Sequence, residues 1–211
     1  MANLSELHDA IVNGDRDAAT AITQEAIDQG RSPEELVEQY MIPAMDEVGR
    51  RFEGEEFFVP ELLLAARAMK GALALLRPLL ADTGASMRGR VVIGTVKGDL
   101  HDIGKNLVSS MLEGGGFEVV DLGSDVAPED FTRAVKENQA NVVGLSALLT
   151  VTMPSMKTTI EALRDAGIRD DVKVMVGGAP LTAAFASEIG ADGYAENAAA
   201  AVRMARDLVA K

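Results

Sequence analysis

Up to about residue 81 the apolar residues recur every three or four positions, as in Leu36, Tyr40, Ile42, Met45 and Val48. No β-branched run or hairpin turn interrupts this spacing, which is typical of amphipathic helices. The pattern predicts four helices, near residues 3–13, 15–29, 33–50 and 58–81. Their short connections favour an N-terminal four-helix bundle.

From Arg90 onward, short apolar β-branched runs alternate with amphipathic helical segments. The runs cover residues 91–96, 118–120, 142–145 and 172–176, and the alanine-rich residues 195–201 belong to a last helix. Strands that are apolar on both faces and separated by helices indicate a parallel sheet covered on both sides. We therefore expect a doubly wound α/β domain, Rossmann-like or flavodoxin-like, with a five-stranded parallel sheet.

The change of pattern places a domain boundary near residue 88. Residues 81–86 carry the composition of a linker. The predicted division is a helical domain with its linker over residues 1–88 and an α/β domain over residues 89–211.

Composition narrows the range of functions. The formal net charge is −13 and no Lys/Arg-rich run offsets it, so we expect neither nucleic acid nor an anionic membrane as a partner. The sequence shows no signal-peptide pattern at its start and no apolar run near the roughly 20 residues that a membrane span needs, so we expect a cytoplasmic protein. The absence of Cys excludes disulfides, thiolate metal sites and a cysteine nucleophile. With His8 and His101 as its two histidines, the chain also lacks the residues for a site of several imidazoles.

The residues with the clearest chemistry are Asp99, His101 and Gly104, where the first predicted strand gives way to the first helix of the α/β domain. That end of a parallel strand is the ligand-binding edge of such sheets. A neutral imidazole can bind a transition metal while a nearby carboxylate orients the ring. On this short pattern alone, however, Asp99 could equally be a helix cap and His101 a surface residue.

Further motifs follow in a fixed order: Ser146-Ala147-Leu148, then Gly177-Gly178, with a run from Met41 to Phe52 in the helical half. With Asp99-x-His101-x-x-Gly104, they make the chain resemble the cobalamin-binding module of methionine synthase and the small corrinoid proteins of methyltransferase systems. The resemblance covers nearly the whole length, helical half and α/β half in order.

The resemblance implies that His101 ligates the cobalt of cobalamin or a related corrinoid from below, base-off and His-on, with Asp99 behind it. The displaced nucleotide tail would lie beside Ser146, Gly177 and Gly178. Other implied contacts in the α/β domain are Gly98, Leu100, Asp102, Ile103, Gly104, Leu148, Thr150, Thr152, Tyr194 and Ala198. Thr152 stands where methionine synthase has a serine in its proton relay.

In the helical half, the resemblance implies that Glu38, Met45, Phe52 and Val59 shield the upper face of the cofactor, with Val59 in place of a leucine. Met, Phe and Val at helical spacing are also typical of an ordinary core. Alternating partners would require this cap to move aside on residues 82–88.

The function implied is that of a carrier of a methyl group on cobalt, which is not catalytic alone. Its partners would be a substrate-specific methyltransferase, an acceptor methyltransferase using tetrahydrofolate or a thiol, and a reductive activase. Three alternatives share part of the pattern: a cobalamin-dependent sensor, the cobalamin subunit of a carbon-skeleton mutase, and a module of response-regulator shape. The sensor would need a DNA-binding domain, the mutase subunit lacks this helical cap, and the third leaves the later motifs unexplained.

Overall fold

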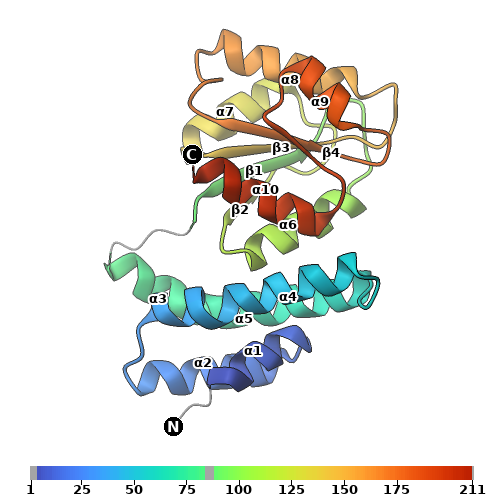
Figure 1. Cartoon of the computed structure of the whole chain (residues 1–211). Helices are drawn as coiled ribbons and strands as arrows, with labels where there is room; N and C mark the ends of the chain where they lie inside the picture. Colours follow the sequence, from blue (N-terminus) through green and yellow to red (C-terminus); the bar gives the residue numbers. More distant parts are fainter. Residues whose placement is uncertain (1–3, 84–87, 211) are drawn as a thin grey trace. The chain divides into compact units, whose positions relative to one another are not determined.

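The computed structural model describes residues 4–83 and 88–210. The chain forms two compact units: Met1–Met87 with Glu113–Gly116, and Arg88–Leu112 with Phe117–Lys211 (Figure 1). The first is helical and the second is an α/β unit.

The helical unit confirms the predicted bundle. Its elements are α1 (Leu4–Val12), α2 (Arg16–Asp28), α3 (Pro33–Leu36), the π-helix η1 (Val37–Met41), α4 (Ile42–Glu53) and α5 (Val59–Thr83). Because α3, η1 and α4 follow one another without a break, they together correspond to the single helix predicted near residues 33–50. Helix α5 extends two residues past its predicted end, so Ala81, Asp82 and Thr83 of the predicted linker are helical, and residues 84–87 lie outside the described part of the chain.

The π-helix η1 has a local cause in Pro43. Proline lacks an amide hydrogen, and its ring clashes with the carbonyl four residues earlier in a regular α-helix. The amide of Ile42 instead donates to the carbonyl of Val37, five residues back. The extra residue widens the turn ahead of the proline, and this widened turn carries Glu38.

The α/β unit contains a sheet in which all five strands are parallel, in the order β2-β1-β3-β4-β5. The strands are β1 (Arg90–Thr95), β2 (Glu118–Asp121), β3 (Val142–Ser146), β4 (Lys173–Gly177) and β5 (Gly193–Ala195). This is the flavodoxin-like order, and it confirms the doubly wound fold expected from the sequence. The helices are α6 (Ile103–Gly114), α7 (Pro128–Asn138), α8 (Pro154–Asp165), α9 (Ala183–Ile189) and α10 (Ala198–Val209).

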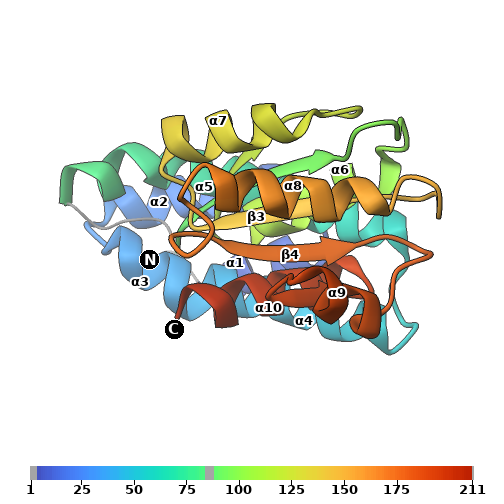
Figure 2. The ribbon, with the colours of Figure 1, turned by 90° about the horizontal axis from the view of Figure 1, so that it is seen from above.

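Helices cover both faces of the sheet, with α7 and α8 on one face and α6 and α10 on the other (Figures 1 and 2). Phe131 of α7 and Ile160 of α8 are completely buried in one core with Val92 and Val143 of the central strands. Gly94 in β1 has no room for a side chain, since a Cβ there would lie 2.8 Å from the ring of Phe131. This close packing fixes the strand that leads to His101.

The strand order creates a switch point between β1 and β3. The chain leaves β1 toward β2 on one side, whereas it leaves β3 toward β4 on the other, so the loops after these two neighbouring strands diverge. Ligands of open α/β sheets bind at such a point, beyond the carboxyl ends of the strands. Both of these loops carry candidate site residues.

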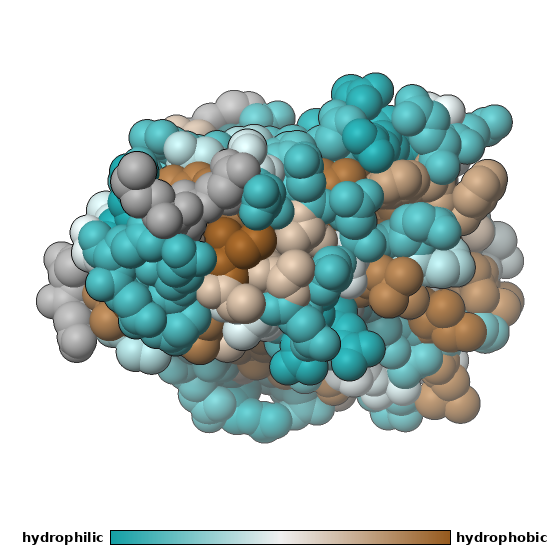
Figure 3. Space-filling model, turned by 90° about the horizontal axis from the view of Figure 1, so that it is seen from below, coloured by the Kyte–Doolittle hydropathy of each residue, from teal (hydrophilic) through white to brown (hydrophobic). Residues whose placement is uncertain are grey.

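Hydrophilic residues dominate the face in Figure 3, with smaller apolar areas between them. No helix in the described part of the chain combines the length and apolar character of a membrane span.

The start of α2 provides a test of the helical unit. The Asp15 side chain accepts a hydrogen bond of 2.9 Å from the amide of Ala18 and caps the helix. Replacing Asp15 by Ala should lower the free energy of unfolding by about 1 kcal/mol. Replacing Asp15 by Asn should lower it much less, because Asn keeps an oxygen that accepts the hydrogen bond. Urea unfolding followed by circular dichroism measures both. Equal losses in the two variants would contradict the cap.

Candidate functional site

His101 lies in the loop between β1 and α6, in the turn of residues 98–101, here called the His101 turn. The turn begins at Gly98, whose φ of 86° favours glycine. The first turn of α6 follows at Ile103, with Gly104 next to it. A Cβ on Gly104 would meet no protein atom within 4 Å, so this helix start faces open space.

The Asp99 carboxylate organises the loop. The residue is completely buried. One oxygen, Oδ1, accepts the amide of His101 at 3.0 Å and lies 2.8 Å from Nδ1 of the same histidine. The other oxygen, Oδ2, accepts the hydroxyl of Thr152 at 2.7 Å and the amides of Leu148 and Leu149 at 2.8 and 3.3 Å. Asp99 therefore joins the His101 turn to the loop after β3.

These bonds decide the charge of Asp99. Burial acts to raise the pKa of its carboxyl. The hydroxyl of Thr152 and the amides of His101 and Leu148 act in the opposite direction, because each donates to the ionised form. The net result is a pKa well below the ordinary value. Asp99 is therefore a buried carboxylate at neutral pH, and a hydrogen bond from His101 would come from Nδ1–H.

The imidazole of His101 is half-exposed, with 50% of its side chain accessible. With Nδ1 turned toward Asp99, Nε2 is the nitrogen available to a metal. Large apolar side chains from the same two loops are also exposed: Leu100, Ile103, Leu148, Leu149 and Val151, by 40 to 85%. An accessible nitrogen with apolar neighbours suits a large, largely apolar ligand that carries its own metal.

The donor set agrees with this interpretation. Within residues 4–83 and 88–210, no group of three or more His, Asp or Glu side chains is arranged to hold a metal ion. A lone histidine is sufficient where a macrocycle supplies the equatorial ligands and the protein supplies an axial one. The residues present therefore fit a corrinoid better than a free ion.

The ends of β3 and β4 bring the other predicted residues to the same edge. Ser146 is the last residue of β3 and pairs with Gly177, the last residue of β4. Gly178 has a φ of 140°, and a Cβ there would lie 1.9 Å from the carbonyl oxygen of Ala147. Glycine is therefore required at this position for backbone to pass backbone.

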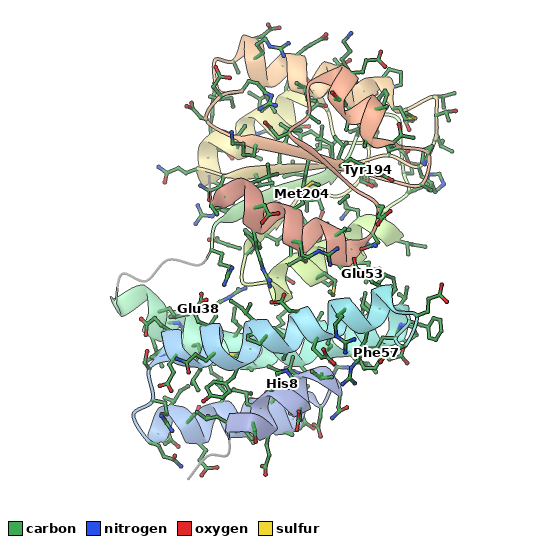
Figure 4. The ribbon with its side chains drawn as sticks, in the orientation of Figure 1. His8, Glu38, Glu53, Phe57, Tyr194 and Met204 are labelled. Carbon is green, nitrogen blue, oxygen red and sulfur yellow. The ribbon has the colours of Figure 1, made fainter. Side chains whose placement is uncertain are left out.

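The remaining predicted positions of the α/β unit surround this edge. Asp102 is partly buried and its carbonyl accepts the amide of Asn106, whereas Thr150 is exposed. Tyr194 is partly buried in β5 and is labelled in Figure 4. Ala198 is the buried first residue of α10, behind the cap Asn197.

The four predicted cap residues belong to the helical unit. Glu38 is exposed in η1 (Figure 4). Met45 is buried and Phe52 partly buried in α4, while Val59, the first residue of α5, is 42% exposed. Met45 is therefore buried like an ordinary core residue, whereas the side chains of Glu38 and Val59 are accessible to solvent.

Three contacts of the site were missed by the sequence analysis. Thr95 donates its hydroxyl to the carbonyl of His101 at 2.9 Å. Asp125 accepts the amide of Gly98 at 2.8 Å, and Leu149 donates its amide to Asp99. A threonine at the carboxyl end of a buried strand was a usable signal for the first, but backbone donors such as that of Leu149 carry no side-chain signature.

Family models match both halves of the chain. A model described as a B12 binding domain matches residues 89–203, and a second model with the same description matches residues 4–77. The chain belongs to the family of B12-binding corrinoid proteins. The family membership expected from the sequence is thereby confirmed.

Relatives of known name match over the full length. The chain is 46% identical over 208 residues to the dimethylamine corrinoid protein of Methanosarcina barkeri. The aligned region covers 98% of this chain and 97% of the relative. A cobalamin-binding protein from Desulfitobacterium hafniense DCB-2 has a solved structure that superposes with a TM-score of 0.82 at 34% identity, over 99% of each chain. A chain of the methanol:cobalamin methyltransferase complex from Methanosarcina barkeri superposes with a TM-score of 0.83 at 31% identity. The match covers 98% of this chain and 79% of that one.

The charge of Asp99 predicts how the stability of the apoprotein varies with pH. Because its pKa is lowered on folding, the ionised carboxylate stabilises the folded state above its ordinary pKa, and this contribution is lost as the pH falls toward the folded pKa. Asp99→Asn should therefore be less stable than the wild type at about pH 7, and the difference should shrink on acidification toward about pH 2. Urea unfolding across this range measures it. A difference independent of pH would contradict the assignment of a buried, ionised Asp99.

Proposed function

We propose that this chain carries a methyl group on the cobalt of a corrinoid bound base-off and His-on, with Nε2 of His101 as the lower axial ligand. The observation that carries the proposal is the contact of 2.8 Å between Nδ1 of His101 and the buried carboxylate of Asp99. A carboxylate on one ring nitrogen fixes the tautomer and makes the other nitrogen a better ligand. The exposed ring among exposed apolar side chains supports the same role.

The corrin would lie over the apolar side chains of the two loops. We assign contacts with the ring or its side chains to Gly98, Leu100, Asp102, Ile103, Gly104, Leu148, Thr150 and Ala198. We assign Thr152 to the proton relay behind His101, where its hydroxyl donates to Asp99. The open space beyond Gly104 supports this placement, since a bulky residue there would press on a planar ligand.

The nucleotide tail would pass the ends of β3 and β4. Ser146 can bond a nitrogen of the displaced base, and the backbone of Gly177 and Gly178 permits a close approach. We assign Tyr194 to the wall of the same passage. Its position on β5, which pairs with β4 in the sheet, supports that assignment.

The helical unit would act as the cap. We propose that Glu38, Met45, Phe52 and Val59 cover the upper face of the cofactor, with residues 1–88 as the cap domain and residues 89–211 as the cofactor-binding domain. The matches of one B12-binding model to each half support this division. Movement on residues 82–88 would expose the cofactor to successive partners.

When bound, the corrinoid supplies a cobalt that accepts a methyl group from one partner and gives it to another. The chain's own residues bind, orient and control protons. With Nε2 on the metal, Nδ1–H of His101 would donate to Asp99, and the His101–Asp99 pair could gain or lose a proton as the bond to the metal breaks and forms. The hydroxyl of Thr152 holds the negative charge on Asp99 in both states, since its one proton goes to the carboxylate in preference to the carbonyl of Leu149.

The partners would be a substrate-specific methyltransferase, an acceptor methyltransferase acting on tetrahydrofolate or a thiol, and a reductive activase. Relatives named for dimethylamine and for methanol match this chain over nearly its whole length. This similarity supports an arrangement in which the separate methyltransferase selects the donor.

The two histidines of the chain provide a matched test of cobalt ligation. His8 in α1 also has its Nδ1 beside an aspartate, at 3.2 Å from Asp9, and is labelled in Figure 4. Replacing His101 by Ala should shift the visible spectrum of the holoprotein, while His8→Ala should leave it unchanged. Asp99→Asn should weaken corrinoid binding by about 10- to 100-fold, the usual effect of losing a carboxylate behind a metal ligand. An unchanged spectrum of His101→Ala with the cofactor still bound would exclude His101 as the ligand.

Methyl transfer can be tested without a partner. The reduced holoprotein treated with methyl iodide should give the visible spectrum of an alkylated corrinoid, and light should reverse it. No spectral change after reduction and methyl iodide would refute the methyl-carrier function while leaving corrinoid binding intact.

A further inference from the structure

The ring of His101 is not fixed by packing. Half of the side chain is exposed, and its neighbours Leu100 and Ile103 are exposed by 73 and 85%. Its position must therefore come from hydrogen bonds. Asp99 accounts for two of them, at the amide and at Nδ1. The carbonyl of His101 needs a separate partner.

Thr95 supplies that partner from the end of β1. Its hydroxyl donates to the carbonyl of His101 at 2.9 Å, and no other described residue donates to this oxygen. Thr95 itself is completely buried. Its own amide donates to the carbonyl of Gly123, and its carbonyl accepts the amide of Val126. The hydroxyl is thus a rigid anchor that connects the sheet to the residue carrying the ligand.

Asp125 holds the other side of the His101 turn. Its amide donates to the carbonyl of Asp99 at 2.9 Å, and its carboxylate accepts the amide of Gly98 at 2.8 Å. The φ of Asp125 is 56°, in the left-handed region that is unfavourable for most residues other than glycine, though Asp and Asn are the most tolerant of them. Glycine would suit this backbone but would remove the acceptor for Gly98. The choice of Asp is therefore explained by the bond to the turn.

We propose that Thr95 and Asp125 are positioning residues that hold the His101 turn in its cobalt-ligating geometry before the cofactor arrives. The proposal rests on the ligation of cobalt by His101. Thr95 fixes the backbone of the histidine from the side of the sheet, and Asp125 fixes the residues ahead of it from the loop after β2. A ligand held in advance binds more tightly because less order is lost on binding.

Thr95 is tested with the holoprotein in its cobalt(II) form, prepared from protein whose histidines carry the heavy nitrogen isotope. Electron paramagnetic resonance then gives a doublet where His101 is the axial ligand and a triplet where the cofactor's own base is. Thr95→Val keeps the shape but removes the hydroxyl, so the ratio of doublet to triplet should fall about tenfold, the factor for one buried hydrogen bond. Thr95→Ser should restore it.

Thr159→Val is the matched control. Thr159 is also completely buried in the α/β unit, and its hydroxyl donates to the carbonyl of Ser155 at 2.8 Å within α8. The Thr159→Val variant should therefore give the same ratio of doublet to triplet as the wild type. A wild-type doublet in Thr95→Val would overturn the role of Thr95 while leaving the ligation by His101 standing. Absence of the doublet in the wild type would overturn both.

Asp125 is tested by two substitutions, one that keeps the acceptor for Gly98 and one that removes it. Asp125→Asn keeps an oxygen acceptor for Gly98 and tolerates the left-handed conformation, so it should keep most of the doublet. Asp125→Gly relieves the backbone but removes the acceptor, and the doublet should fall several-fold although the fold is retained, as judged by thermal unfolding. If the Gly variant keeps the wild-type doublet, Asp125 serves only the loop conformation and its positioning role is wrong.

Discussion

A carboxylate that is completely buried is costly unless donors surround it, and Asp99 has donors from both sides of the switch point. The amide and ring of His101 approach one oxygen, while Thr152 and the amides of Leu148 and Leu149 approach the other. The loops after β1 and β3 cannot separate without leaving this charge unsatisfied. The geometry of His101 therefore depends on the charge of Asp99, and so does the shape of the edge on which a corrinoid would lie.

The fold explains why this charge can be placed here. Parallel strands end at one edge, and the order β2-β1-β3-β4-β5 makes β1 and β3 neighbours whose connections diverge. The amides of Leu148 and Leu149 lie in the β3–α8 loop, beyond the last strand pairs, and they donate to the carboxylate that the loop of β1 supplies. Close packing at Gly94 and Gly178 fixes the strands and turns on either side. The result is a rigid base beneath an accessible imidazole and exposed apolar side chains.

The two units of the chain differ in the residues that they would offer to a cofactor. The α/β unit holds the candidate ligand with hydrogen bonds, whereas the helical unit offers residues of mixed character, such as the exposed Glu38 and the buried Met45. Pro43 widens the helix around Glu38 into a π-helix, a distortion that is often found at functional sites. The proposed carrier role would need both properties, because the side with the metal ligand would have to keep its geometry while the opposite side would have to open to partners.

Helical and strand periodicities are local and change near residue 88, so the two-part architecture was predictable from the sequence alone. The sequence also marked Asp99, His101, Ser146 and Gly177-Gly178 as one family pattern. The predicted helix ends at residues 50 and 81 differ from the observed ends of α4 at Glu53 and α5 at Thr83, because the last turn of a helix depends on its caps and contacts. The folded structure was needed to show that Thr152, Leu148 and Leu149 share the Asp99 carboxylate and that Thr95 and Asp125 bond the His101 turn. These contacts join residues 6 to 53 positions apart, and the backbone groups among them have no side-chain signal in a sequence.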